Sequence, residues 1–164
     1  MSNSNSSLAV TNPISRFTLS AFGLVPISLT MLVLRVTLAI PFWKSAMTKW
    51  DDWFTLSFGA LASFDDFRLH ILGAEYPYPA PELMAYASAI CEVTFPVLLV
   101  FGLFTRYAAL GLLGMTAVIQ LTVPDGWQNF HLPWASMALA ILTFGPGRIA
   151  LDYVLGLDRN SRPN

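Results

Sequence analysis

The chain has 164 residues, a length typical of one domain. It is 55% hydrophobic and 12% charged, whereas an ordinary soluble domain has roughly 25% charged residues. A soluble domain of this size keeps much of its surface in water, so the composition predicts a membrane protein. The net charge of -1 argues against nucleic acid as a partner, and the single cysteine, Cys91, excludes an intramolecular disulfide.

In chain order, residues 1–22 are rich in Ser and Asn, show no signal-peptide pattern, and are expected to form a disordered cytoplasmic tail. Residues 23–155 are expected to form one all-α domain, an integral membrane four-helix bundle. A span needs about 20 apolar residues, and the apolar segments predict spans at about 27–49, 82–104, 107–123 and 131–145. Residues 156–164 are expected to form a second cytoplasmic tail.

The outer loop, residues 51–81, connects the first two spans and differs from the other links. It contains apolar residues at near-helical spacing, followed by Asp65 and Asp66. This pattern predicts an amphipathic helix lying on the membrane surface. The proline-rich stretch Tyr76–Pro81 is expected to be extended, because proline disfavours helix in the residue before it.

The basic residues predict the orientation. One side of the four-span layout carries most arginines: Arg16, Arg106, Arg148, Arg159 and Arg162. The opposite side carries the acidic outer loop. By the positive-inside rule, both termini are cytoplasmic and the outer loop faces away from the cytoplasm.

Glu92 is the one charged residue in the apolar run from residue 83 to residue 104. A charge at that depth costs between about 2.5 and more than 10 kcal/mol unless it is paired, protonated or hydrated. Arg35, Lys44 and Lys49 are the candidate partners from the first span. If that span is centred near Arg35, Arg35 matches the depth of Glu92; if it is centred near Pro41, Lys44 is the better match. The sequence leaves this register open.

Each other candidate has a structural reading and a functional one. Lys49 is expected to reach the headgroups or the neighbouring acidic residues Asp51 and Asp52. Lys44, beside Trp43, could bind an anionic or quinone oxygen or make a cation–π contact. His131 is expected to be an interfacial polar residue, with a proton relay as the alternative.

The remaining patterns carry little chemistry. A copper site built from His70 and His131 with Met47 and Met84 has no supporting spacing, so no metal is expected. Cys91 lies deep in an apolar segment and is expected to be inert packing. The sequence contains no phosphate-binding glycine loop, no H-E-x-x-H and no nucleophile elbow.

Several segments together resemble the DoxX family of small four-helix bacterial membrane proteins. They are the stretches LRVTL at 34–38, LLVFGLFTRYAAL at 98–110, HLPW at 131–134 and GPGRIALD at 145–152, together with Glu92. The family pattern puts Arg35 near the start of the first span. The resemblance therefore favours Lys44, Lys49 or a ligand as the group that compensates the charge of Glu92.

The resemblance implies a bacterial inner-membrane protein linked with redox systems that pass electrons from thiols or sulfur compounds to quinone. The chain has no cofactor motif of its own, so it is expected to be a membrane subunit or anchor. The candidate catalytic residues are Glu92, Lys44, Lys49, Arg35 and His131, and the quinone contacts expected are Glu92, Lys44 and Trp43.

Two other functions are compatible with the sequence. In the first, the chain is a non-catalytic adaptor or assembly factor whose outer loop docks a periplasmic partner, and the buried charges only hold helices in register. In the second it is a small transporter, although it lacks the inverted repeat and paired broken helices often seen in that class. A homo-oligomer is compatible with each.

Overall fold

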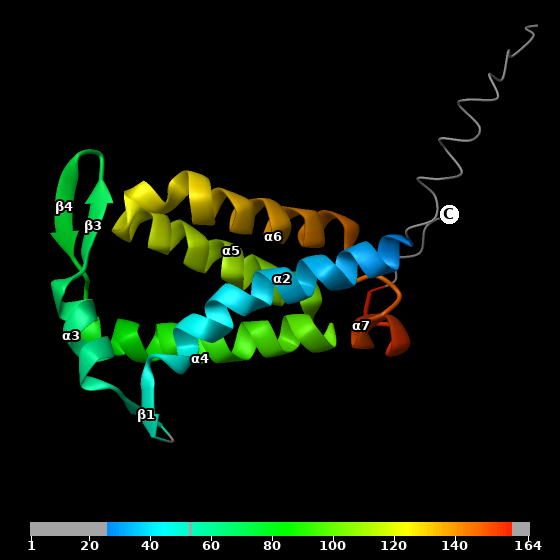
Figure 1. The fold of residues 1–164 in the computed structure, drawn as a ribbon, viewed down its shortest axis with the longest axis horizontal. Helices are drawn as coiled ribbons and strands as arrows, with labels where there is room; N and C mark the ends of the chain where they lie inside the picture. The colour runs from blue at the N-terminus through cyan, green and yellow to red at the C-terminus, as the bar shows by residue number, and fades with distance from the viewer. Residues whose placement is uncertain (1–25, 53, 159–164) are drawn as a thin grey trace, which may run out of the picture.

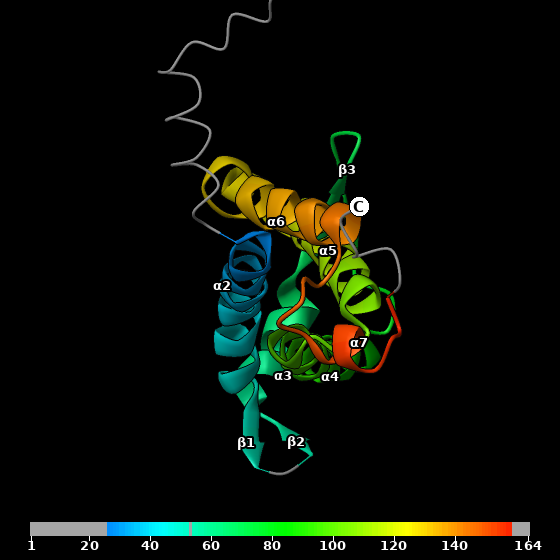
Figure 2. The same cartoon turned by 90° about the vertical axis from the view of Figure 1, so that its right-hand side faces the viewer.

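The computed structural model of this chain describes residues 26–52 and 54–158. The tail expected at residues 1–22, and residues 159–164 of the second tail, lie outside the described residues. Most of the described chain is helical, and the long helices run side by side (Figure 1). Seen along their length, they surround a common axis, with α2 on one side and α4, α5 and α6 around the rest (Figure 2).

The long helices are α2 (Ile27–Met47), α4 (Pro81–Phe101), α5 (Thr105–Thr122) and α6 (Leu132–Phe144). A 3-10 turn, η1 (Pro124–Gly126), and a π-helical turn, η2 (Trp127–His131), lead directly into α6. The core between them is built from small and branched apolar side chains of all four helices, among them Leu38, Leu99, Leu112 and Ile141, each with no exposed surface. Each helix therefore buries one apolar face against the others.

Of the described helices, α2 and α4 are long and apolar enough to cross a membrane by length and composition. The helix α5 has 18 residues and α6 has 13, and neither meets that criterion. Apolar side chains nevertheless stay exposed along them, including Leu110 on α5 and Leu139 on α6. Length and composition by themselves thus mark two spans rather than the four expected.

The segment between α2 and α4 departs from the all-α expectation. Strands β1 (Trp50–Asp52) and β2 (Thr55–Leu56) form one antiparallel hairpin, and β3 (Arg68–Ile71) and β4 (Ala74–Pro77) form another. The helix α3 (Phe58–Asp66) lies between the hairpins. We call this end of the molecule the hairpin end. The expected extended conformation of Tyr76–Pro81 holds at Tyr76 and Pro77, which belong to β4, whereas Ala80 is left-handed with φ 47 and Pro81 begins α4.

Part of the apolar face of α3 packs on the bundle, while Phe58 stays 83% exposed; contact of α3 with a membrane surface stays a prediction. Ala60 and Phe64 are buried, and Phe64 contacts the rings of Phe67 and Tyr78. The Tyr78 hydroxyl is 2.6 Å from the Thr122 hydroxyl at the end of α5. The residues between α2 and α4 therefore form a folded cover over one end of the helices, because their apolar side chains bury against α4 and α5. We call this cover the roof.

At the opposite end of the molecule, two buried charged side chains join the helices to the C-terminal segment. Arg35 of α2 has no exposed surface and donates to the Leu99 carbonyl at 3.0 Å and to the Ile149 carbonyl. Leu99 lies in the last turn of α4, and its carbonyl also accepts from the N–H of Gly102, the residue that caps the helix. A cation there also complements the helix dipole. Arg35 is thus the side chain that joins α2, the end of α4 and the C-terminal segment.

Asp152 stabilises the start of α5. It lies in the short helix α7 (Leu151–Val154) and accepts from the backbone N–H groups of Phe104 at 2.7 Å and Thr105 at 2.8 Å. These groups open α5, which has no side-chain cap of its own. An anion at a helix N-terminus is stabilising, and Asp152 also interacts electrostatically with Arg35. The stretches GLFTR and GPGRIALD therefore meet in space.

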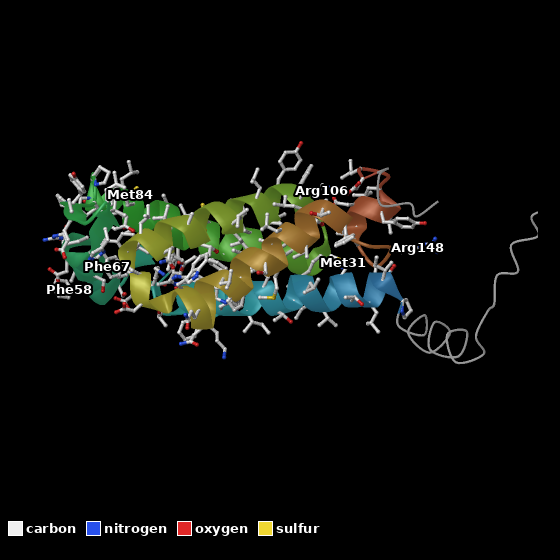
Figure 3. The ribbon with its side chains drawn as sticks, turned by 90° about the horizontal axis from the view of Figure 1, so that it is seen from above. Met31, Phe58, Phe67, Met84, Arg106 and Arg148 are labelled. Atoms are coloured by element: carbon white, nitrogen blue, oxygen red, sulfur yellow. The ribbon has the colours of Figure 1, made fainter. Side chains whose placement is uncertain are left out.

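Figure 3 shows Arg106 and Arg148 at this end, which we call the arginine end, and Phe58, Phe67 and Met84 at the hairpin end. Arg106 pairs with Asp158 at 2.8 Å and donates to the Leu142 carbonyl. The bundle is thus polarised, with basic side chains at one end and the folded hairpin segment at the other.

Gly102→Ala should destabilise the fold strongly. Gly102 has φ +69, and an added Cβ would lie 2.6 Å from the Ala150 Cβ and against the Arg35 guanidinium. Gly156→Ala is the matched control, because Gly156 also has φ +69 but open space around it. Both variants carry the strain of a left-handed residue, about 1 kcal/mol, so a larger fall in thermal stability for Gly102→Ala measures the close packing of Arg35 and Ala150 on Gly102. Equal losses would contradict a stabilising role for that packing.

Candidate functional site: a Lys–Glu pair in an aromatic-lined cavity

Glu92 pairs with Lys49. The Lys49 ammonium lies 2.6 Å from Oε2 of Glu92, and their side chains are 14% and 4% exposed. The same ammonium donates to the Ser45 hydroxyl at 2.7 Å, and the Ser88 hydroxyl donates to Oε1 of Glu92 at 3.2 Å. A buried pair is tolerated only when its remaining donors and acceptors are also used. The serines on α2 and α4 use one further donor of Lys49 and one further acceptor of Glu92.

Local structure explains how Lys49 reaches so deep a carboxylate. The helix α2 ends at Met47, and Lys49 follows in a turn whose backbone N–H donates to the Ala46 carbonyl. The Lys49 carbonyl accepts from the Ser57 N–H at 2.8 Å, which fixes the turn against the start of α3. The expectation that Lys49 reaches headgroups or the acidic residues beside it is therefore wrong, since the turn directs its side chain back into the bundle.

The pair forms part of the wall of a cavity of about 750 Å³ between the helices and the roof. Its volume is in the usual range of small-molecule sites, roughly 300 to 1,000 Å³. The rest of the wall is mostly apolar, and aromatic rings come from every side: Phe42, Phe64, Phe67, Tyr78, Phe95 and Trp134. A site with one ion pair and many aromatic faces suits a ligand that is mainly apolar and carries polar atoms at one end.

Pro96 gives α4 an unusual environment next to the pair. It lies inside α4, four residues after Glu92, and has no N–H to donate to the Glu92 carbonyl. The backbone of α4 thus lacks one helical hydrogen bond at the residue that carries the buried charge. Pro41 likewise removes one helical hydrogen bond from α2, and Pro41 also lines the cavity.

Arg35 is not a partner of Glu92. Its guanidinium is engaged at the arginine end, with the carbonyls of Leu99 and Ile149. Its Nε is buried without a hydrogen-bond partner among the described atoms. Arg35 thus fastens helices at a distance from the cavity and does not line it.

Lys44 and Trp43 do not line the cavity either. Both are exposed on α2, Trp43 by 41%, and neither belongs to the cavity wall. The quinone contacts expected for Lys44 and Trp43 therefore have no geometric support, because the preceding residue, Phe42, takes the inward face of α2.

His131 is buried beside the cavity and is 4% exposed. Its Nδ1 lies 2.6 Å from Oε1 of Gln120, and its ring packs on Trp134 with centroids 5.5 Å apart. Trp134 lines the cavity and His131 does not. His131 accordingly supports an aromatic wall residue and has no direct contact with the Lys49–Glu92 pair.

The sequence patterns did not mark Ser45 and Ser88 as the hydrogen-bond partners of Lys49 and Glu92. A signal was present, because Ser45 precedes Lys49 by four residues and Ser88 precedes Glu92 by four. Residues at this spacing share one face of a helix. The serines could therefore have been placed beside the charges before the cavity was known.

The residues of the site suit an organic ligand better than a metal ion. Within the described part of the chain, no group of three or more His, Cys, Asp or Glu is placed to hold a metal. Cys91 lines the cavity beside Glu92 and is a free thiol. The polar groups that could contact a ligand are thus the Lys49 ammonium, the Glu92 carboxylate and nearby hydroxyls.

Comparison with known proteins agrees with this architecture. The DoxX family model matches residues 30–125, which include both members of the ion pair. The chain belongs to the DoxX family. It is also 26% identical over 140 residues to a Haemophilus influenzae protein described as uncharacterized, covering 77% of this chain and 83% of that one. No solved structure gives a significant match. DoxX membership indicates a membrane protein, as the composition predicts.

The ion pair should show strong energetic coupling. Lys49→Met and Glu92→Gln should each lower the free energy of unfolding by about 3 kcal/mol, because each leaves an unpaired buried partner. The double variant should be no less stable than either single variant. Denaturant unfolding in mild detergent measures this, with the exposed Lys44→Met as a control that changes little. Additive losses in the double variant would contradict the pairing.

Proposed function

We propose that this DoxX-family chain crosses the bacterial inner membrane with α2, α4, α5 and α6. The apolar length of α2 and α4 supports this arrangement, as do the exposed apolar residues on α5 and α6. Arg106 and Arg148 lie at the end opposite the hairpins (Figure 3). By the positive-inside rule, the arginine end and both termini are cytoplasmic and the hairpin end faces the periplasm.

In this arrangement the chain is the membrane subunit or anchor of a redox system that oxidises thiols or sulfur compounds with quinone. The observation that carries the proposal is the Lys49–Glu92 pair in the wall of an aromatic-lined cavity. Aromatic walls accept a flat ring, and the pair offers an ammonium donor to ring oxygens beside a carboxylate that can take up and pass on a proton.

A quinone would supply a two-electron acceptor, with the electrons coming from the thiol- or sulfur-oxidising partner. While Glu92 is protonated, Lys49 lacks its counter-charge and could stabilise negative charge on a ring oxygen. Transfer of the Glu92 proton to that oxygen would restore the carboxylate and re-form the ion pair, and a second proton would complete the two-electron reduction. Ser45 and Ser88 hold the two groups in place throughout. A fresh proton reaches Glu92 from the hairpin end, where the cavity residues Thr48 and Ser63 are exposed.

Binding of decylubiquinone to the purified protein in lipid nanodiscs tests this function. The wild-type protein should bind it, and Lys49→Met should bind it about tenfold more weakly, because a hydrogen bond to a charged group contributes about 1.5–3 kcal/mol and Lys49 is the charged donor of the site. Lys44→Met, which removes a charge outside the cavity, should change the Kd by less than about twofold. Absence of binding to the wild-type protein, or an unchanged Kd in Lys49→Met, would contradict the proposal.

A second candidate function is a membrane adaptor whose hairpin end captures a periplasmic protein. Large apolar side chains are exposed there, with Phe54 at 84%, Phe58 at 83% and Leu72 at 103%. Phe54 and Leu72 also have positive φ, at 65 and 52, a conformation that is costly for such residues. Strained exposed apolar residues at the tips of hairpins suit a docking surface.

Phe58→Ser with Leu72→Ser separates this candidate from the first. If the hairpin end is an adaptor surface, the double variant should lose the periplasmic partner recovered by cross-linking with the wild-type protein, while decylubiquinone binding stays unchanged. Leu157→Ser is the control, since Leu157 is 54% exposed at the arginine end. Unchanged recovery of the partner in the double variant would contradict the adaptor function.

A further inference from the structure

The cavity that holds the ion pair reaches the molecular surface between α4 and α5. Three of its wall residues there are also exposed: Ala87 on α4, and Gly114 and Val118 on α5. Exposed wall residues on two neighbouring helices, with open space beside Gly114, mark an opening of the cavity. We call this opening the α4–α5 mouth. It differs from the hairpin-end wall, where the exposed residues include the hydroxyl-bearing Thr48 and Ser63.

Packing between α4 and α5 explains where the mouth begins. Gly111 lies against the Phe95 ring so closely that an added Cβ would be 2.5 Å from it. One turn further along α5, Gly114 has nothing within 4 Å of the position of an added Cβ. The helices thus touch at Gly111 and leave an open space at Gly114. The hairpin end closes the far side of that space, where Tyr78 meets Thr122.

We propose that the α4–α5 mouth binds the apolar chain of a lipid-soluble ligand whose oxygen-bearing headgroup contacts Lys49 and Glu92. This inference rests on the proposed function, because it places lipid outside α4 and α5. The mouth is built from Ala87, Gly114 and Val118, which carry no polar side-chain atom, so it suits an alkyl or isoprenoid chain. Such a ligand enters sideways from the bilayer with its headgroup leading, and Gly114 keeps the entrance open.

Gly114→Phe is the variant that tests the mouth. Gly114 has open space on its free side, and a helix favours Phe over Gly, so the fold should be retained. Decylubiquinone should bind to this variant about tenfold more weakly, the loss expected when roughly two methylene groups leave their site. The same dimethoxy-methyl-benzoquinone ring without a chain should bind as it does to the wild-type protein.

Leu110→Phe is the matched control, because Leu110 lies on the same helix, is 57% exposed and is not part of the cavity wall. It should change neither affinity. Gly114→Ala should give a smaller loss for decylubiquinone than Gly114→Phe. Equal effects of Gly114→Phe on both quinones, or no effect on either, would overturn the proposal.

A second measurement does not depend on quinone and separates the failure of the mouth from the failure of the redox function. A decyl alcohol with a photoreactive diazirine at the end of its chain is irradiated with the protein in nanodiscs, and its adducts are mapped by mass spectrometry. Adducts should concentrate at residues 84–95 and 111–123, should fall in Gly114→Phe, and should persist in Leu110→Phe. Adducts spread evenly over exposed apolar positions and insensitive to Gly114→Phe would overturn the mouth, even if quinone binds. Concentrated adducts without quinone binding would leave the mouth standing and overturn the redox function.

Discussion

Burial of the Glu92 carboxylate is the constraint on which the hairpin half of this molecule depends. A charge at 4% exposure needs a cation, and Lys49 can supply it only because α2 ends early and turns back. The same turn is bonded to Ser57, the residue that caps α3. The ion pair, the end of α2 and the start of the roof are therefore one connected structure. A change in the charge of Glu92 would act on all three.

The two halves of the bundle use buried charge in different ways. At the arginine end, Arg35 donates to a carbonyl at the end of α4, and Asp152 accepts from N–H groups at the start of α5. Their side chains face backbone and leave no cavity wall for a ligand. At the hairpin end, Lys49 and Glu92 face a cavity of about 750 Å³. The first pair fits a structural role, and the second is placed where a ligand can meet it.

Sequence patterns predict much of the helical layout, because long apolar runs and short links leave few alternatives. They also identify Glu92 as the residue to explain. They do not identify its partner, since the depth of Lys49 depends on the turn after Met47 and on its bond to Ser57. Nor do they reveal the roof, because the apolar spacing of α3 fits a membrane surface and a bundle equally well. The hairpins are missed because their strands are two to four residues long, too short for a clear alternating pattern.

The contact between the GLFTR and GPGRIALD stretches likewise depends on tertiary structure and cannot be predicted from either stretch alone. Each stretch is distinctive in the sequence, but the reason appears only when Asp152 is seen to cap α5 and Gly102 to make room for Arg35. Small side chains carry similar information on α5, where Gly111 permits contact and Gly114 leaves space. The two glycines lie three residues apart on α5, and only the structure shows which one permits contact and which one leaves space.

The central claim is that the Lys49–Glu92 pair is a ligand site and not merely a fastener of helices. Equilibrium binding of decylubiquinone to the Lys49→Met/Glu92→Gln double variant tests this most directly, because that variant removes the pair without leaving an unpaired buried charge. The account predicts a folded protein of near wild-type thermal stability whose affinity is lower by about tenfold or more. An unchanged affinity in the folded double variant would contradict the claim and leave the pair as a helix fastener.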